Sequence, residues 1–131
     1  MVFGNTFEKS TEAGIWLYNN KYNTIYNNFV KNNVNEGIWM RDSSSNVIVN
    51  NYFYNDKNSV LISGLPANKW NLTRSAQRSI TGGANSGGNS WGQPNGLGFS
   101  QVTPATKGIC NQPYTLATNN VDKLPLKWAK K

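Results

Sequence analysis

The chain has 131 residues, with 13 Lys and Arg, six Asp and Glu, no His and one Cys. This length suffices for one domain with a modest core. The absence of His, with Cys110 standing alone, excludes His/Cys zinc clusters, Ser-His-Asp and Cys-His catalysis, and disulfide scaffolds. Asn, with 22 copies, is the most unusual feature, and because Asn and Gly favour turns over helices we expect no helical bundle.

The net charge of +7 lies in the second half of the chain. Residues 1–65 carry five cations and five anions, whereas residues 66–131 carry eight cations and the single anion Asp122. This excess indicates either a solvated surface or a patch for an anionic polymer, membrane or partner protein. We expect no nucleic acid partner, because the cations are dispersed and no nucleic-acid-binding motif accompanies them. No apolar stretch predicts an integral membrane segment, and the first residues do not predict a signal peptide.

A 23-residue repeat organises residues 1–75. The triplet Gly-Ile-Trp at 14–16 recurs at 37–39, and Asn23, Asn27, Asn28 and Asn32 recur as Asn at the same offset. Within each unit, apolar residues expected to face the core alternate with residues expected to face outward. This alternation predicts short strands. The expected strands are 15–18, 24–26 and 29–30 in one unit, then 38–41, 47–49 and 52–54 in the next.

Three strands per unit and Asn-rich corners predict an all-β fold, a right-handed parallel β-helix of about three 23-residue turns with an irregular C-terminal cap. Asn tolerates the left-handed backbone conformation that such corners need. Stacking of the turns predicts inward ladders of like residues. The expected ladders are Ile15/Ile38/Leu61, Ile25/Ile48, Phe7/Val30/Phe53 and the amide ladder Asn5/Asn28/Asn51.

The repeat ends near residue 75. We expect residues 1–75 to form the β-helix turns and residues 76–131 to form the cap and a basic tail of the same domain. The expected apolar anchors of the cap are Trp91, Phe99, Tyr114, Leu124 and Leu126. The first turn would present unpaired strand edges, so we expect preceding turns or another chain to cover it.

Segments 14–20 (GIWLYNN) and 23–28 (NTIYNN) resemble the repeats of the NosD-like family, whose repeats are also described as carbohydrate-binding and sugar-hydrolysis (CASH) repeats. Segments 68–73, 87–91, 112–114 and 120–126 resemble the closing part of such proteins. The resemblance implies a parallel β-helix located outside the cytoplasm, as an extracellular, cell-surface or periplasmic protein.

The resemblance does not extend to metal sites. Segment 92–111 contains no carboxylate, although the family often has an Asp- and Gly-rich stretch there that suits calcium. The copper association of the family does not transfer either, because the only soft donors are Met1, Met40 and Cys110. We therefore expect no metal and no cofactor.

An outward aromatic stripe is the main candidate for ligand binding. Strand alternation places Trp16, Trp39, Tyr18 and Arg41 away from the core, with Tyr26 on the next face. Exposed aromatic rings offer flat platforms for sugars or for a partner protein. The alternative is that another domain or a loop of the cap covers this stripe.

Candidate catalytic groups are few. Glu36 follows Glu12 by one position more than the repeat, so the two would lie diagonally on adjacent turns. They could form the acid pair of a retaining glycosidase, or they could be two solvated corner residues. Arg41 and Asp42 follow a strand, where a polysaccharide lyase keeps its basic and metal-binding groups. A lyase would need further carboxylates, and the alternative is a surface ion pair.

Two further residues could be modified. Asn71 begins the triplet Asn-Leu-Thr, an acceptor for glycosylation if the chain is exported. Cys110 is either a buried, idle thiol or half of an intermolecular disulfide.

Together these features predict a non-catalytic extracellular or cell-surface module that is structural or binds polysaccharide. Two alternatives remain open: a fragment of a polysaccharide lyase or glycoside hydrolase, and a structural accessory subunit of a larger complex. The expected partner is accordingly a polysaccharide, or a protein of the cell envelope or of that complex.

Overall fold

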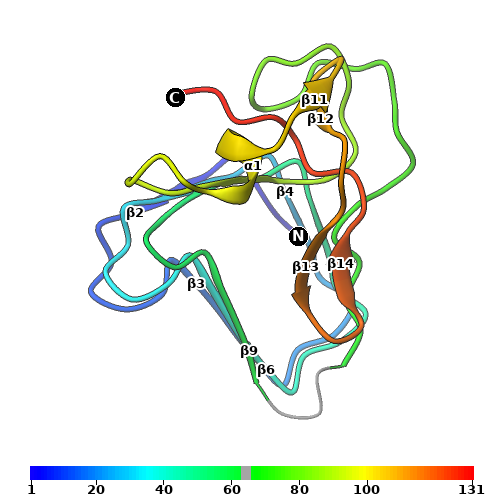
Figure 1. Cartoon of the computed structure of the whole chain (residues 1–131). Coiled ribbons are helices and arrows are strands. Elements are labelled where there is room, and N and C mark those ends of the chain that lie inside the picture. Colours follow the sequence, from blue (N-terminus) through cyan, green and yellow to red (C-terminus); the bar gives the residue numbers. More distant parts are fainter. Residues whose placement is uncertain (63–65) are drawn as a thin grey trace.

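A computed structural model describes residues 1–62 and 66–131 (Figure 1). The described part is almost entirely strands and turns, with one four-residue helix, so the all-β class is confirmed. No helix in these two ranges is long and apolar enough to cross a membrane. The elements are β1 (Val2–Phe3), β2 (Thr6–Glu8), β3 (Ile15–Tyr18), β4 (Thr24–Tyr26), β5 (Phe29–Lys31), β6 (Ile38–Arg41), β7 (Val47–Val49), β8 (Tyr52–Tyr54), β9 (Ser59–Ile62), β10 (Ser90–Gly92), α1 (Phe99–Val102), β11 (Ala105–Thr106), β12 (Ile109–Cys110), β13 (Tyr114–Ala117) and β14 (Asn120–Asp122).

Three short parallel sheets are built from every third strand among β1 to β9, and β10 joins β8 in one of them. Their orders are β1-β4-β7, β2-β5-β8-β10 and β3-β6-β9. Figure 1 shows them as the sides of a common interior, with β3, β6 and β9 superposed along one side. All six strands predicted from the repeat are present, and the pairs β3·β6, β4·β7 and β5·β8 keep the predicted repeat offset.

The predicted ladder Ile15/Ile38/Leu61 is wrong in its last member. Ile15 pairs with Ile38, but Ile38 pairs with Ser59 and Met40 pairs with Leu61. The physical reason is a shorter corner, because the connection from β8 to β9 has two residues fewer than that from β5 to β6. The unchanged repeat offset would place Met40 on Ser63, which lies outside the described residues.

At the corners, the two residues of each consecutive Asn pair have different roles. The first Asn adopts a positive φ, as at Asn19 (50°), Asn27 (56°), Asn32 (54°) and Asn50 (52°). These values confirm that the left-handed conformation falls at the predicted corners. The second Asn turns inward and forms hydrogen bonds with the equivalent residue of the next turn.

These inward amides form three columns. The predicted column Asn5–Asn28–Asn51 is confirmed, since each Oδ1 accepts the backbone N–H and the Nδ2 of the preceding member at 3.0–3.2 Å. It continues to Asn89. Two further columns follow the same pattern: Asn23–Asn46–Asn68–Asn120 and Asn33–Asn55–Asn58.

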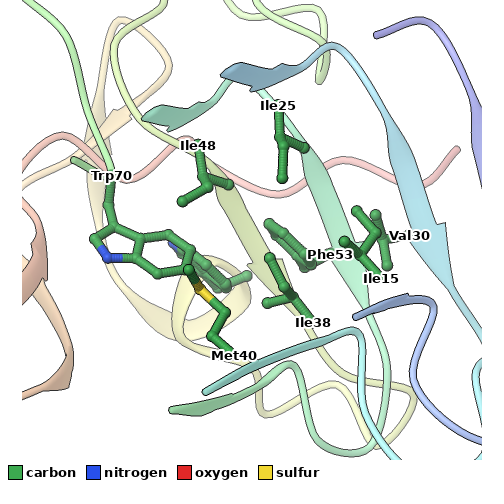
Figure 2. Packing of buried hydrophobic residues seen from close by; sticks show 9 residues of the cluster. Ile15, Ile25, Val30, Ile38, Met40, Ile48, Phe53 and Trp70 are labelled. Atoms are coloured by element: carbon green, nitrogen blue, oxygen red, sulfur yellow. The ribbon is translucent and has the colours of Figure 1, made fainter. Parts of the chain in front are cut away.

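The apolar core fills the space between the three sheets, and Figure 2 shows its labelled side chains directed into this interior. Except for Trp70, they come from the inward faces of strands, as period-2 alternation requires. The predicted pairs Ile25/Ile48 and Val30/Phe53 are in register and fully buried, and Phe7 packs against them from the first turn. Trp70, which the repeat did not predict, closes the core with 1% exposure.

The C-terminal part seals one end of this interior with aromatic rings. Trp91 of β10 stacks on Phe53 with ring centroids 4.6 Å apart and meets Tyr114 edge-on at 5.2 Å. Phe99 stacks on Tyr114, and Leu126 is fully buried. The domain boundary at residue 75 stays a prediction, and β10 adds a fourth strand to a parallel sheet beyond it.

Candidate ligand-binding site

The outer face of the β3-β6-β9 sheet bears the aromatic stripe. Ile15 is buried and Leu17 packs against the core, so alternation directs Trp16 and Tyr18 outward, each 59% exposed. Parallel pairing sets Trp39 beside Trp16 and Arg41 beside Tyr18. The two indole rings meet edge-to-face with their centroids 4.8 Å apart. The stripe ends there, because Val60 pairs with Trp39 on the third strand.

A small pocket opens beside these two indoles. Its volume is about 200 Å³, and it is lined by Glu12, Ala13, Trp16, Asn35, Glu36 and Trp39. All six residues come from two adjacent turns, and none comes from the cap. The structure therefore brings together four residues that the sequence had placed in two separate hypotheses, the two Trp residues and the two Glu residues.

The two carboxylates reach this pocket from equivalent corners. Glu12 lies between β2 and β3, and Glu36 lies between β5 and β6 directly before Gly37. The Glu36 carbonyl accepts the Gly14 N–H at 3.0 Å, which fixes one corner on the other. The ion pairs found among the described residues involve Glu8 and Asp42, so neither pocket carboxylate is neutralised by a cation of these ranges.

Two lining residues, Ala13 and Asn35, were missed in the sequence. The repeat contained the signal, since Asn35 stands one repeat after Glu12 and Glu36 stands one repeat after Ala13. The pocket is thus formed by the same corner in two successive turns.

Arg41 contacts Asp42 and Tyr18 at the surface. The Arg41 guanidinium lies 5.9 Å from the Tyr18 ring centroid, and its Nε is 3.6 Å from the Asp42 carboxylate. Asp42 has φ 49°, so it occupies the left-handed corner position that Asn19 occupies one turn earlier. Among residues 1–62 and 66–131, no three His, Cys, Asp or Glu side chains converge to hold a metal, so no metal-binding cluster stands beside this pair.

Tyr26 is not part of the stripe. It belongs to β4 in a different sheet and stacks on Phe3 of β1 with ring centroids 5.1 Å apart. It lines a separate open pocket of about 420 Å³ together with Arg78. A ligand of the Trp16/Trp39 pocket is thus not expected to contact Tyr26.

Asn71 and Cys110 lie in the C-terminal half. Asn71 lines an open pocket of about 550 Å³ with Lys69 and Lys123, and its Oδ1 accepts the Lys123 N–H at 3.0 Å. Its glycosylation stays a prediction. Cys110 is unpaired and buried, and burial raises the pKa of its thiol, as expected of an idle thiol.

Asp122, the only anion of the basic half, is fully buried. Its carboxylate accepts hydrogen bonds from the Asn89 N–H (2.7 Å), the Trp91 Nε1–H (2.9 Å) and the Leu124 N–H (3.1 Å). Burial raises its pKa to about 7, although these three donors act in the opposite direction. The surface of residues 66–131 therefore carries cations only.

The chain is an all-β repeat protein with three parallel sheets and a pocket on one outer face. Residues 1–96 match the model of a family described as "Periplasmic copper-binding protein (NosD)". The chain belongs to the NosD family. The family's periplasmic description agrees with the localisation outside the cytoplasm that the sequence predicts. Neither a comparison with curated proteins nor one with solved structures found a match.

The residues of this chain do not fit the copper named in the family description. The chain has no His, and its two internal soft donors, Met40 and Cys110, are 2% and 4% exposed in β6 and β12. Met1 is exposed but stands next to β1, in another sheet from Met40. A copper site needs several such donors around one point. We therefore derive no chemistry that passes through copper.

Proposed function

We propose that the chain is a non-catalytic module of an extracellular or periplasmic protein and that it binds polysaccharide at the pocket of Trp16 and Trp39. The observation that carries this proposal is the indole pair of Trp16, which is 59% exposed, and the half-buried Trp39, beside a pocket that two carboxylates and one amide also line. Apolar faces of sugar rings stack on such indoles, and carboxylate and amide oxygens accept sugar hydroxyl groups. A volume of about 200 Å³ is below the ~300–1,000 Å³ of typical ligand pockets, which suits one sugar residue of a longer chain.

The scaffold that we propose for this module is a right-handed parallel β-helix. Its support is the strand order, in which successive strands join successive sheets and each sheet is parallel. Crossovers between parallel strands are right-handed in nearly all known cases. In this architecture the same corner recurs on every turn, which is how two turns supply one pocket.

Affinity electrophoresis through gels that contain soluble polysaccharides tests this proposal. We expect retardation of the wild type by at least one polysaccharide, and at least a tenfold weaker interaction for Trp16→Ala, equivalent to ~1.4 kcal/mol. Because Trp16 is 59% exposed, this substitution should leave thermal stability nearly unchanged. Tyr22→Ala is the matched control, since Tyr22 is 81% exposed and does not line the pocket. Equal retardation of Trp16→Ala and wild type would remove the indole pair from the proposal.

A glycoside hydrolase is a second candidate, because Glu12 and Glu36 line one pocket. A retaining enzyme needs two carboxyl groups ~5–5.5 Å apart, one as acid and one as nucleophile. Release of reducing ends from a bound polysaccharide, abolished by both Glu12→Gln and Glu36→Gln, would establish this activity. Binding without release would leave the module non-catalytic.

A structural accessory subunit is a third candidate. The strands β1, β2 and β3 each have a partner on one side only within their sheets. Such edges pair readily with strands of another chain or of further turns. Light scattering on the native particle, with identification of co-purifying chains, tests this candidate, and a stable monomer would count against it.

A further inference from the structure

The pocket of Trp16, Trp39, Glu12 and Glu36 is lined by acidic groups, although the chain as a whole is basic. The chain carries a net charge of +7, yet the six lining residues include two carboxylates and no Lys or Arg. The nearest cation along the stripe, Arg41, is engaged by Tyr18 and Asp42. Acidic polysaccharides are thus disfavoured at this pocket, although the basic C-terminal half would attract them.

Indole rings add a second attraction for positive charge. An ammonium group near the face of a Trp ring is stabilised by the negative potential of the ring, and Trp is the best of the aromatic residues in this respect. Here two indoles and two carboxylates line one small space. A ligand that combines an apolar ring face with an ammonium group satisfies both kinds of residue.

We propose that this pocket selects amino sugars with a free amine, such as the residues of a deacetylated hexosamine polymer. This inference rests on the proposed polysaccharide binding and specifies its substrate class. The sugar ring stacks on the exposed Trp16 indole, and its ammonium group lies between the carboxylates of Glu12 and Glu36. A neutral or N-acetylated sugar retains the stacking but loses the charge interaction.

The test is calorimetric titration at pH 6 with two oligosaccharides of equal length. One is a glucosamine oligomer with free amines, and the other is the N-acetylglucosamine oligomer. We expect the free-amine oligomer to bind roughly tenfold more tightly, with a preference that decreases as salt is added. In Glu12→Gln combined with Glu36→Gln, this preference should disappear while binding of the acetylated oligomer stays unchanged.

Asp56→Asn is the matched control, because Asp56 is an exposed carboxylate outside the pocket and its loss changes the net charge alone. The Asp56→Asn variant should keep the wild-type preference for the free-amine oligomer. Equal or tighter binding of the acetylated oligomer would overturn the amine selectivity and leave polysaccharide binding standing. If neither oligomer nor a neutral glucan bound, both proposals would fall. A preference that survives in the double Gln variant would assign it to groups other than Glu12 and Glu36 and would also overturn the inference.

Discussion

The two ends of the stacked turns close in different ways. At the C-terminal end every amide column finds a terminal partner: Asn89 donates its backbone N–H to Asp122, Asn68 donates to Asn120, and Asn58 donates to the Gly92 carbonyl. At the first turn, the backbone N–H groups of Asn5, Ser10 and Asn23 donate to the column residues of the second turn, and Ser10 takes the place that Asn33 has one turn later. For those three side-chain oxygens, no donor from a neighbouring turn is found among the described residues.

This difference shows what a cap must do in such a fold. It must cover the apolar interior, as Trp91 and Leu126 do, and it must also supply acceptors to the last N–H groups of each column. At the first turn, β1, β2 and β3 are the end strands of their sheets, and within residues 1–62 and 66–131 the three column ends have no such cap. Substitutions within a column and at its closure, and a copper titration, each test this difference between the turns and the cap.

Interrupting a column should have the largest effect. Asn51 is fully buried, accepts from the Asn28 N–H and Nδ2, and donates from Nδ2 to Ile25, Val49 and Asn89. Asn51→Leu leaves these buried groups without partners, and we expect the free energy of unfolding to fall by about 5 kcal/mol. Denaturant unfolding monitored by Trp fluorescence measures this loss.

Asn35→Ala is the control for this substitution, because Asn35 is exposed at a corner and forms no side-chain hydrogen bond found among the described residues. It should change stability by less than about 0.5 kcal/mol. If Asn51→Leu lowered the free energy of unfolding by less than ~1 kcal/mol, the columns would be a consequence of the fold and would not stabilise it.

The buried closure at Asp122 should make stability depend on pH. Its pKa rises from 3.8 in the unfolded chain to about 7 in the folded protein, so the folded state binds the proton more tightly. The contribution to stability is therefore complete below pH 4, declines as the pH rises to 7, and is lost above that. The decline is at most about 4 kcal/mol for this shift.

Thermal unfolding between pH 4 and pH 8 measures this decline, and Asp122→Asn is the matched variant. Because the amide does not titrate, the variant should lose most of the slope over this range, whatever its stability. The exposed carboxylate Asp56 gives the reference, and Asp56→Asn should keep the wild-type slope. Identical slopes in wild type and Asp122→Asn would contradict the raised pKa.

The same contrast between the repeated turns and the cap explains which parts of the fold could be predicted from the sequence. A constant repeat offset predicted six strands, the left-handed corners and the Asn5/Asn28/Asn51 column, because each feature recurs and its position is counted from its neighbour. It failed at Leu61, where one corner is two residues shorter. A single shortened corner leaves no periodic signal.

The cap and the pocket depend on contacts that occur once. The bonds of Asp122 with Asn89 and Trp91 span 33 and 31 residues and have no counterpart in the repeat. The pocket was half predicted, since alternation placed the Trp pair outward and the Glu pair was noted from its spacing. That all four share one pocket follows from the corners preceding β3 and β6, which alternation does not describe.

Copper should have the smallest effect of all. The donors that could attract it are divided between the two regions, with Met40 buried in the turns and Cys110 buried in the cap. A ligand that binds only the folded state raises stability with the logarithm of its concentration relative to Kd, by ~2.7 kcal/mol at a hundredfold excess over Kd. We expect no rise in the unfolding temperature with Cu(I) or Cu(II), in wild type or in Cys110→Ser. A rise that is present in wild type and absent in Cys110→Ser would assign copper to the thiol. A rise in the unfolding temperature of both proteins would mean that donors other than Cys110 bind copper, which would contradict the separation of the soft donors in the structure.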